Sequence, residues 1–230
     1  MEATIGNNIQ RRSRYLFFSA IFLFIFVLLG FTLKVIVHPV RLARYTPLVI
    51  THAGLMMAWL FLFAYQARLV ANGSLKYHKK LGGLSVWLVI AMVVTGEWAS
   101  INLFYEHQRT DLLVGNAFTM STFLCLYVFA IYAVKKGDID THKRMIFIAS
   151  LSIIGPAIGR YLEILDVNVM LYFVAYPLML IALTVGYDLS VNNKIHKATY
   201  AGIGFVVAMN VLMMASMPVL IPYFNQLLES

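Results

Sequence analysis

Charged side chains are scarce in this chain of 230 residues: Asp, Glu, Lys and Arg together make up 12% of it, about half the share found in soluble domains. Hydrophobic residues make up 61%, and the mean hydropathy is +0.79. So few charges cannot cover the surface of a water-soluble domain of this size, which excludes a soluble enzyme, a disordered regulator and a coiled coil. The composition therefore predicts a membrane protein.

Cysteine is almost absent, with Cys125 the single one, so a disulfide framework and a site built from several cysteines are both excluded. The sequence also lacks a Walker motif, a G-x-S-x-G elbow and an H-E-x-x-H pair, which leaves an ATPase, a serine hydrolase and a zincin without support. The net charge of +8 does not indicate a nucleic-acid partner, because the basic residues lie in short loops between apolar runs rather than in one patch.

Seven apolar runs account for most of the sequence, each close to the ~20 residues that cross a hydrocarbon core. They cover residues 15–37, 47–70, 81–104, 112–134, 144–165, 168–190 and 198–222. The sequence therefore predicts a single domain over residues 1–230: an all-α integral membrane bundle of seven transmembrane helices. Pro156 and Pro177 fall inside the fifth and sixth runs and predict kinks there.

Basic residues are divided unequally between the two sides of this bundle. With the N-terminus inside, thirteen of the eighteen basic residues lie in the inner segments. Because positive charge is retained on the cytoplasmic side, the N-terminus is predicted to be cytoplasmic and the C-terminus outside. Anionic lipid headgroups on the inner side are then the expected partner of this charge.

A cluster of polar residues is predicted at the inner ends of the helices. It comprises His78, His142, His196, Asp188 and Gln66. The three histidines open odd-numbered runs, so topology places all three at one face of the membrane. Neutral imidazole binds haem iron, and three histidines with one carboxylate could also hold zinc or another divalent ion. The alternative is that these are interfacial histidines beside lysines, in contact with headgroups or capping loops.

A second cluster is predicted nearer the outer ends of the helices. It comprises His52, Glu97, Asn116, Arg160 and Glu163. Arg160 follows His142 by five turns, so a continuous helix would carry both on one face. The residues could form a proton or quinol-headgroup site, or Arg160 could pair with Glu97 or Glu163 to lock helices together.

Two stretches resemble the cytochrome b561 family of membrane haem proteins. HAGLMMAWLFLFAYQAR at 52–68 is similar to a family helix with H-A-x-x-M, a Trp and an A-R end, although the usual P-x-G after the Trp is missing. HKKLGG at 78–83 is similar to the family's H-x-x-x-G helix opening. The family holds two haems between histidines on alternate helices, so the resemblance implies one haem b between His78 and His142. A second haem would need a histidine opposite His52, where the fourth run has Asn116.

Nearly the whole chain also resembles a family of uncharacterised bacterial polytopic membrane proteins. HKRMIFIASLSIIGPAIGR at 142–160 and YDLSVNNKIHKATYAG at 187–202 carry this likeness. It implies a multi-pass protein of the bacterial inner membrane and brings no established activity.

Three functions follow as hypotheses. The first is a b-type haem protein for electron transfer with a quinone or respiratory-chain partner, its iron held by His78 and His142 and supported by His196 or Asp188. The second is a metal-dependent hydrolase that uses the inner histidines and Asp188. The third is a non-catalytic accessory or assembly subunit, or a small transporter.

Overall fold

The computed structural model describes residues 2–40 and 45–229 as a bundle of long helices, with no β-strand in these two stretches. Seven helical segments within them are long and apolar enough to cross a membrane. The predicted all-α, seven-span membrane bundle is therefore confirmed. The side of the membrane on which each terminus lies stays a prediction.

The helices largely follow the predicted apolar runs and extend beyond several of them. In chain order they are α1 (Glu2–Val37), α2 (Pro47–Ala71), α3 (Leu75–His107), α4 (Thr110–Lys135), α5 (Ile139–Ser152), α6 (Gly155–Ile164), α7 (Tyr172–Asn192) and α8 (Lys197–Glu229), with a short 3₁₀ turn, η2 (Val169–Leu171), before α7. The longer helices continue into the polar sequence that flanks the runs, as α1 does over residues 2–14 and α3 over residues 75–80.

The fifth predicted helix is broken into two. Helix α5 ends at Ser152 and α6 begins at Gly155, with Pro156 in the first turn of α6. Proline has no N–H to donate and its ring clashes with the carbonyl four residues earlier, here that of Ser152, which kinks or breaks a helix. At Pro156 the helix is broken. Pro177, in contrast, lies inside α7 without ending it.

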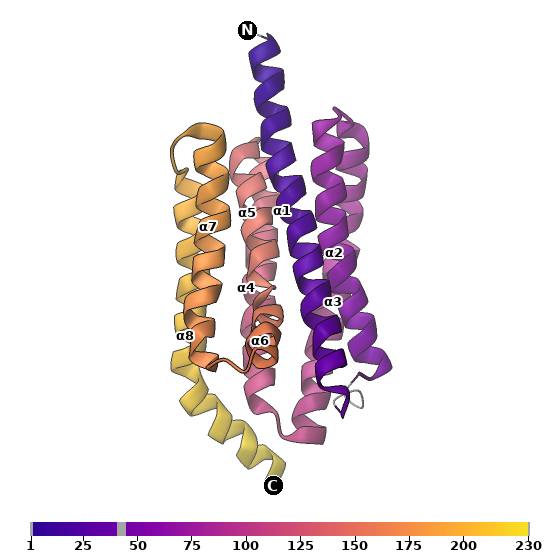
Figure 1. The fold of residues 1–230 in the computed structure, drawn as a ribbon, viewed down its shortest axis with the longest axis vertical. Helices are drawn as coiled ribbons and strands as arrows, with labels where there is room; N and C mark the ends of the chain where they lie inside the picture. Colours follow the sequence, from indigo (N-terminus) through magenta and orange to yellow (C-terminus); the bar gives the residue numbers. More distant parts are fainter. Residues whose placement is uncertain (1, 41–44, 230) are drawn as a thin grey trace.

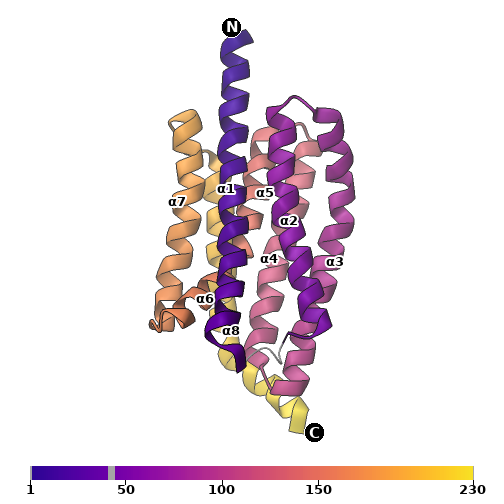
Figure 2. The same ribbon diagram turned by 45° about the vertical axis from the view of Figure 1, so that its right-hand side comes forward.

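The helices pack as neighbours along most of their length (Figure 1). Helix α1 lies between α2 and α7, and its N-terminal end projects beyond the bundle (Figure 2). Helix α4 packs against α3, α5 and α8. The α5–α6 span is the most enclosed: 72% of its most apolar stretch is buried, compared with 39% or less in every other span. This span therefore forms the centre of the bundle.

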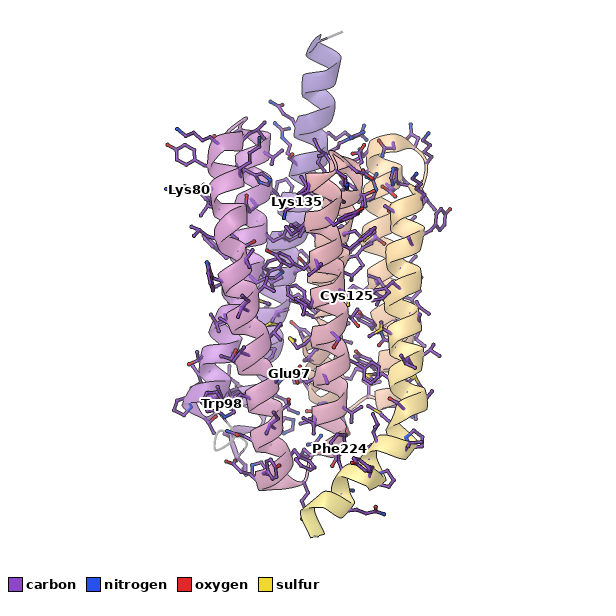
Figure 3. The ribbon with its side chains drawn as sticks, turned by 180° about the vertical axis from the view of Figure 1, so that it is seen from behind. Lys80, Glu97, Trp98, Cys125, Lys135 and Phe224 are labelled. Carbon is purple, nitrogen blue, oxygen red and sulfur yellow. The ribbon has the colours of Figure 1, made fainter. Side chains whose placement is uncertain are left out.

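Aromatic side chains fill the interior between α2, α4 and α5. The Trp59 indole N–H donates to the Ser150 hydroxyl at 3.1 Å, and its ring meets Phe123 and Tyr127 edge-on at 5.1 and 5.8 Å. Phe63 contacts Phe147 at 6.0 Å between ring centres. Many apolar side chains point outward instead, among them the labelled Trp98 in Figure 3. In a bilayer, these outward side chains contact lipid.

The end of α8 bends across the outer end of the bundle (Figures 1 and 3). Pro218 and Pro222 lie inside this helix and account for a bend. Beyond them, the Phe224 ring contacts Phe104 of α3 at 5.9 Å, and the Thr110 hydroxyl donates to the Asn225 amide oxygen at 2.5 Å. The last span is therefore attached to the start of α4 and the end of α3.

Candidate functional site

A buried ion pair lies at the N-terminal end of the bundle. Arg144 of α5 is 2% exposed and Asp188 of α7 is fully buried. The guanidinium donates to Asp188 Oδ1 from Nε at 2.9 Å and from Nη2 at 2.6 Å. The other carboxylate oxygen, Oδ2, accepts the His196 backbone N–H at 2.8 Å and the Thr199 hydroxyl at 2.5 Å. All the partners of this carboxylate therefore come from the protein, and the pair joins α5, α7 and the start of α8.

Other polar residues extend this pair to α1. Arg144 Nη1 donates to the Asp140 carbonyl oxygen at 2.8 Å. The Asp140 carboxylate in turn accepts from Arg12 Nη1 at 3.0 Å, and Arg12 Nη2 donates to the Asn192 amide oxygen at 2.7 Å. Sequence reasoning treated Arg144 and Arg12 as loop charges that orient the chain. Arg144 opens the predicted fifth run, and an ionisable residue within a span was the signal that could have singled it out.

The three inner histidines have different surroundings. His196 directly precedes α8, and its Nδ1 accepts the Ala198 backbone N–H at 3.2 Å, so the side chain caps that helix. Asp188, the predicted carboxylate ligand, is bound to Arg144. In the part of the chain that the structure describes, no three His, Cys, Asp or Glu side chains form a group that could hold a metal ion.

His78 and His142 remain together as a pair. Their rings, from α3 and α5, lie close enough for charge on one to affect the other. The His142 Nδ1–H donates to the Ala130 carbonyl oxygen of α4 at 2.9 Å. This bond fixes the tautomer and leaves Nε2 unprotonated, with a lone pair to donate. Nδ1 of His78 and Oε1 of Gln66 are both buried without a hydrogen-bond partner. His78 and Gln66 therefore each retain one unsatisfied polar atom, and the His78 ring also forms a hydrogen bond with the backbone of Gln66.

Part of the predicted outer cluster lies between α2, α3 and α4. His52 Nδ1 is 3.1 Å from the Thr95 hydroxyl oxygen, and its ring packs against Gly96, where a Cβ would lie 2.7 Å from Cε1. One helix turn away, Asn116 Nδ2 of α4 lies 3.4 Å from the Ser100 hydroxyl oxygen. Glu97 points towards α4 (Figure 3). Polar groups from three helices thus lie at similar depth.

The other two outer residues belong to a separate contact between α6 and α1. The Arg160 guanidinium lies 3.7 Å from the centre of the Phe31 ring and donates to the Pro156 carbonyl oxygen at 2.8 Å. Glu163 forms an ion pair with Lys34, whose side chain is 6% exposed. Among the described residues, the expected ion pair between Arg160 and Glu97 does not form. The break after Ser152 also removes the continuous helix that was predicted to carry both His142 and Arg160.

Comparison of the chain with protein-family models, with curated proteins and with solved structures finds no significant match in any of the three. The resemblances to the cytochrome b561 family and to the uncharacterised bacterial family therefore stay predictions. The candidate site rests on the chemistry of its own residues, among which His78 has a buried ring nitrogen without a partner and His142 a ring oriented by Ala130.

Proposed function

We propose that this protein is an integral membrane electron carrier that holds one b-type haem between His78 and His142. The observation that carries the proposal is the buried Nδ1 of His78, which lacks a partner beside an imidazole whose Nε2 is available. A buried polar atom without a partner costs roughly 1–3 kcal/mol. Binding of a prosthetic group at the pair would offset this cost.

The orientation of His142 favours a role as an axial ligand. Histidines that bind a metal through one ring nitrogen usually donate the other N–H to a carbonyl or carboxylate, which fixes the ring and makes the ligating nitrogen more basic. His142 makes this second bond to Ala130. His196 lacks such freedom because its Nδ1 caps α8. The proposal therefore retains His78 and His142 as ligands and assigns His196 to helix capping.

Buried alanines lie on the two helices that pack beside α3 and α5. They are Ala64 and Ala67 of α2, and Ala130 and Ala133 of α4, and the Ala130 carbonyl oxygen accepts from His142. When bound, haem would accept and donate single electrons. The chain itself would hold the iron through two neutral imidazoles and surround it with apolar side chains, and both features set the reduction potential.

A quinol or a respiratory-chain protein in the same membrane is the proposed electron partner, and the bacterial inner membrane, with anionic lipids on the cytoplasmic side, is the proposed location. The hydrolase alternative has less support. Its carboxylate, Asp188, is already bound to Arg144, to Thr199 and to the backbone of His196. A zinc ion would have to break this buried ion pair before it could bind there.

An optical spectrum tests the proposal. Protein produced in haem-replete cells and purified in detergent should show a Soret band and, after reduction, a sharp α band, with a haem-to-protein ratio of about one since one bis-histidine pair is present. His78→Ala and His142→Ala should each lose these bands. His107→Ala is the matched control because His107 lies exposed at the far end of α3. Protein without a Soret band, or bands that survive both substitutions, would refute the proposal.

A further inference from the structure

The interruption of the fifth span lies beside a small polar cavity. Helix α5 ends at Ser152, near the middle of the Ile139–Ile164 span, and α6 restarts at Gly155 (Figure 1). The cavity has a volume of about 10 Å³, enough for one particle the size of a water molecule. Its lining comes from α4, α5, α7 and α8 and comprises Phe118, Thr119, Thr122, Ser152, Tyr172, Tyr176, Met209, Asn210 and Met213.

The hydroxyl protons of three lining residues are already used within their own helices. Thr119 and Thr122 each donate to the carbonyl oxygen four residues earlier, at 2.8 and 2.7 Å. Ser152 donates to the carbonyl oxygen three residues earlier at 2.8 Å. Because each hydroxyl has one proton, the three oxygens can offer only lone pairs to whatever enters the cavity. Thr122 and Ser152 are 4% and 6% exposed, so these oxygens have little access to solvent.

The α7 and α8 side of the lining is similar. Asn210 Nδ2 donates to the Val206 carbonyl oxygen at 2.8 Å, which leaves its Oδ1 as an acceptor beside Tyr176. Tyr172 stacks on Tyr176 at 5.7 Å between ring centres, and its hydroxyl abuts Gly155 at the start of α6. Four acceptor oxygens, one each from Thr119, Thr122, Ser152 and Asn210, therefore line the cavity. The groups there that could donate are the two tyrosine hydroxyls and the second N–H of the Asn210 amide.

We propose that this cavity binds one dehydrated monovalent metal cation, Na⁺ or K⁺. A cation is bound by acceptor oxygens, and the oxygens of Thr119, Thr122, Ser152 and Asn210 offer lone pairs to the cavity. The two tyrosine oxygens can do the same when their O–H groups turn away. The C-terminal end of α5 adds the negative end of a helix dipole, and broken membrane helices with such ends are a known setting for monovalent cations. The lining contains no carboxylate, so a divalent ion would lack the charge that offsets its loss of hydration. The site is separate from the histidine pair and does not depend on the proposed haem.

Thermal unfolding in different salts tests this inference. Full-length protein in detergent is melted at constant ionic strength while choline chloride is replaced stepwise by NaCl or KCl. A ligand that binds the folded state raises the melting temperature with increasing concentration. The expected result is a graded rise with Na⁺ or K⁺ above the value in choline chloride, because choline is too large for the cavity.

Two isosteric variants locate the effect. Thr122→Val removes one cavity oxygen and should weaken the apparent cation affinity roughly 10- to 100-fold, the equivalent of one hydrogen bond to a charged group. Thr184→Val is the control: Thr184 is 2% exposed and donates to the carbonyl oxygen four residues earlier in the same way, but it does not line the cavity. Thr119→Val replaces Thr122→Val if that variant does not fold. Equal melting temperatures in all three salts, or an affinity that Thr122→Val leaves unchanged, would overturn the inference in favour of a bound water.

Discussion

Loss of the Asp188 carboxylate should destabilise the protein more than loss of any exposed acid. The substitution Asp188→Asn keeps the side-chain volume but leaves the buried Arg144 guanidinium with only one counter-charge, the half-exposed Asp140 carboxylate at 3.7 Å. Breaking a buried pair by removal of one partner costs about 3–5 kcal/mol, mainly because the remaining charge stays out of water. Asn retains one oxygen that can accept from the guanidinium, so we expect a loss near the lower limit, about 3 kcal/mol.

Asp111→Asn is the matched control for this experiment. Arg109 and Asp111 also form a two-bond pair, at 2.8 and 2.7 Å, but their side chains are 40% and 47% exposed. Exposed pairs contribute about 0–1 kcal/mol. The measurement is equilibrium unfolding of the purified protein by SDS in mixed micelles, followed by circular dichroism.

The companion variant Arg144→Met completes a double-mutant cycle. With the carboxylate already replaced, removal of the guanidinium should cost much less than it does in the wild-type protein, because no charge is left unpaired. Two results would show that the pair does not hold α5 against α7. One is a free energy of unfolding for Asp188→Asn within about 1 kcal/mol of wild type. The other is that the losses in this free energy caused by the two substitutions simply add.

Three further predictions concern packing, pH and topology. Gly96→Ala should lower the free energy of unfolding by about 1–3 kcal/mol in the same assay, because the added Cβ would overlap the His52 imidazole of α2. Gly83→Ala is the control: a Cβ there has open space around it and should not destabilise the protein. A hydrogen bond from Thr141 lowers the pKa of the Asp138 carboxyl in the folded protein. The ionised carboxylate therefore contributes fully to stability above the ordinary Asp pKa of about 3.9, and this contribution is lost as pH falls through the lower pKa of the folded state. Asp138→Asn should remove this pH dependence of the free energy of unfolding. The proposed orientation places His107, at the end of α3, outside the cell. In a background without the native cysteine, His107→Cys should therefore react with an impermeant maleimide in intact cells. Labelling only after permeabilisation would reverse the orientation.

The seven spans could be predicted from the sequence because the bilayer imposes a simple rule. Every backbone polar group in the hydrocarbon core must be bonded within its own segment, so a run of about 20 apolar residues has few alternatives to a helix. The position of Pro156 also indicated an irregularity in the fifth run. The sequence did not determine whether this proline would bend the helix or divide it. A division requires neighbouring groups that can form hydrogen bonds with the backbone N–H and C=O groups exposed at the break.

The grouping of the polar residues required the tertiary structure. Depth along each helix placed Asp188 beside the three histidines, but depth does not determine which way a side chain points around the helix axis. The packing of α5 against α7 brings Arg144 to Asp188, although the charge of Arg144 had been interpreted only as an orientation signal. In the same way, Glu163 pairs with Lys34 of α1, a contact between segments more than a hundred residues apart.

The sequence by itself thus determined that the chain is a membrane bundle, because composition and run length follow from the thickness and polarity of the bilayer. It also identified the residues that can carry charge or bind a ligand. Only the tertiary structure decided how these residues are used: Asp188 binds Arg144, His196 caps α8, and His142 donates to the Ala130 carbonyl oxygen. The physical reason is that a buried polar group takes whichever partner helix packing brings within about 3 Å, and packing depends on side chains distributed over the whole chain.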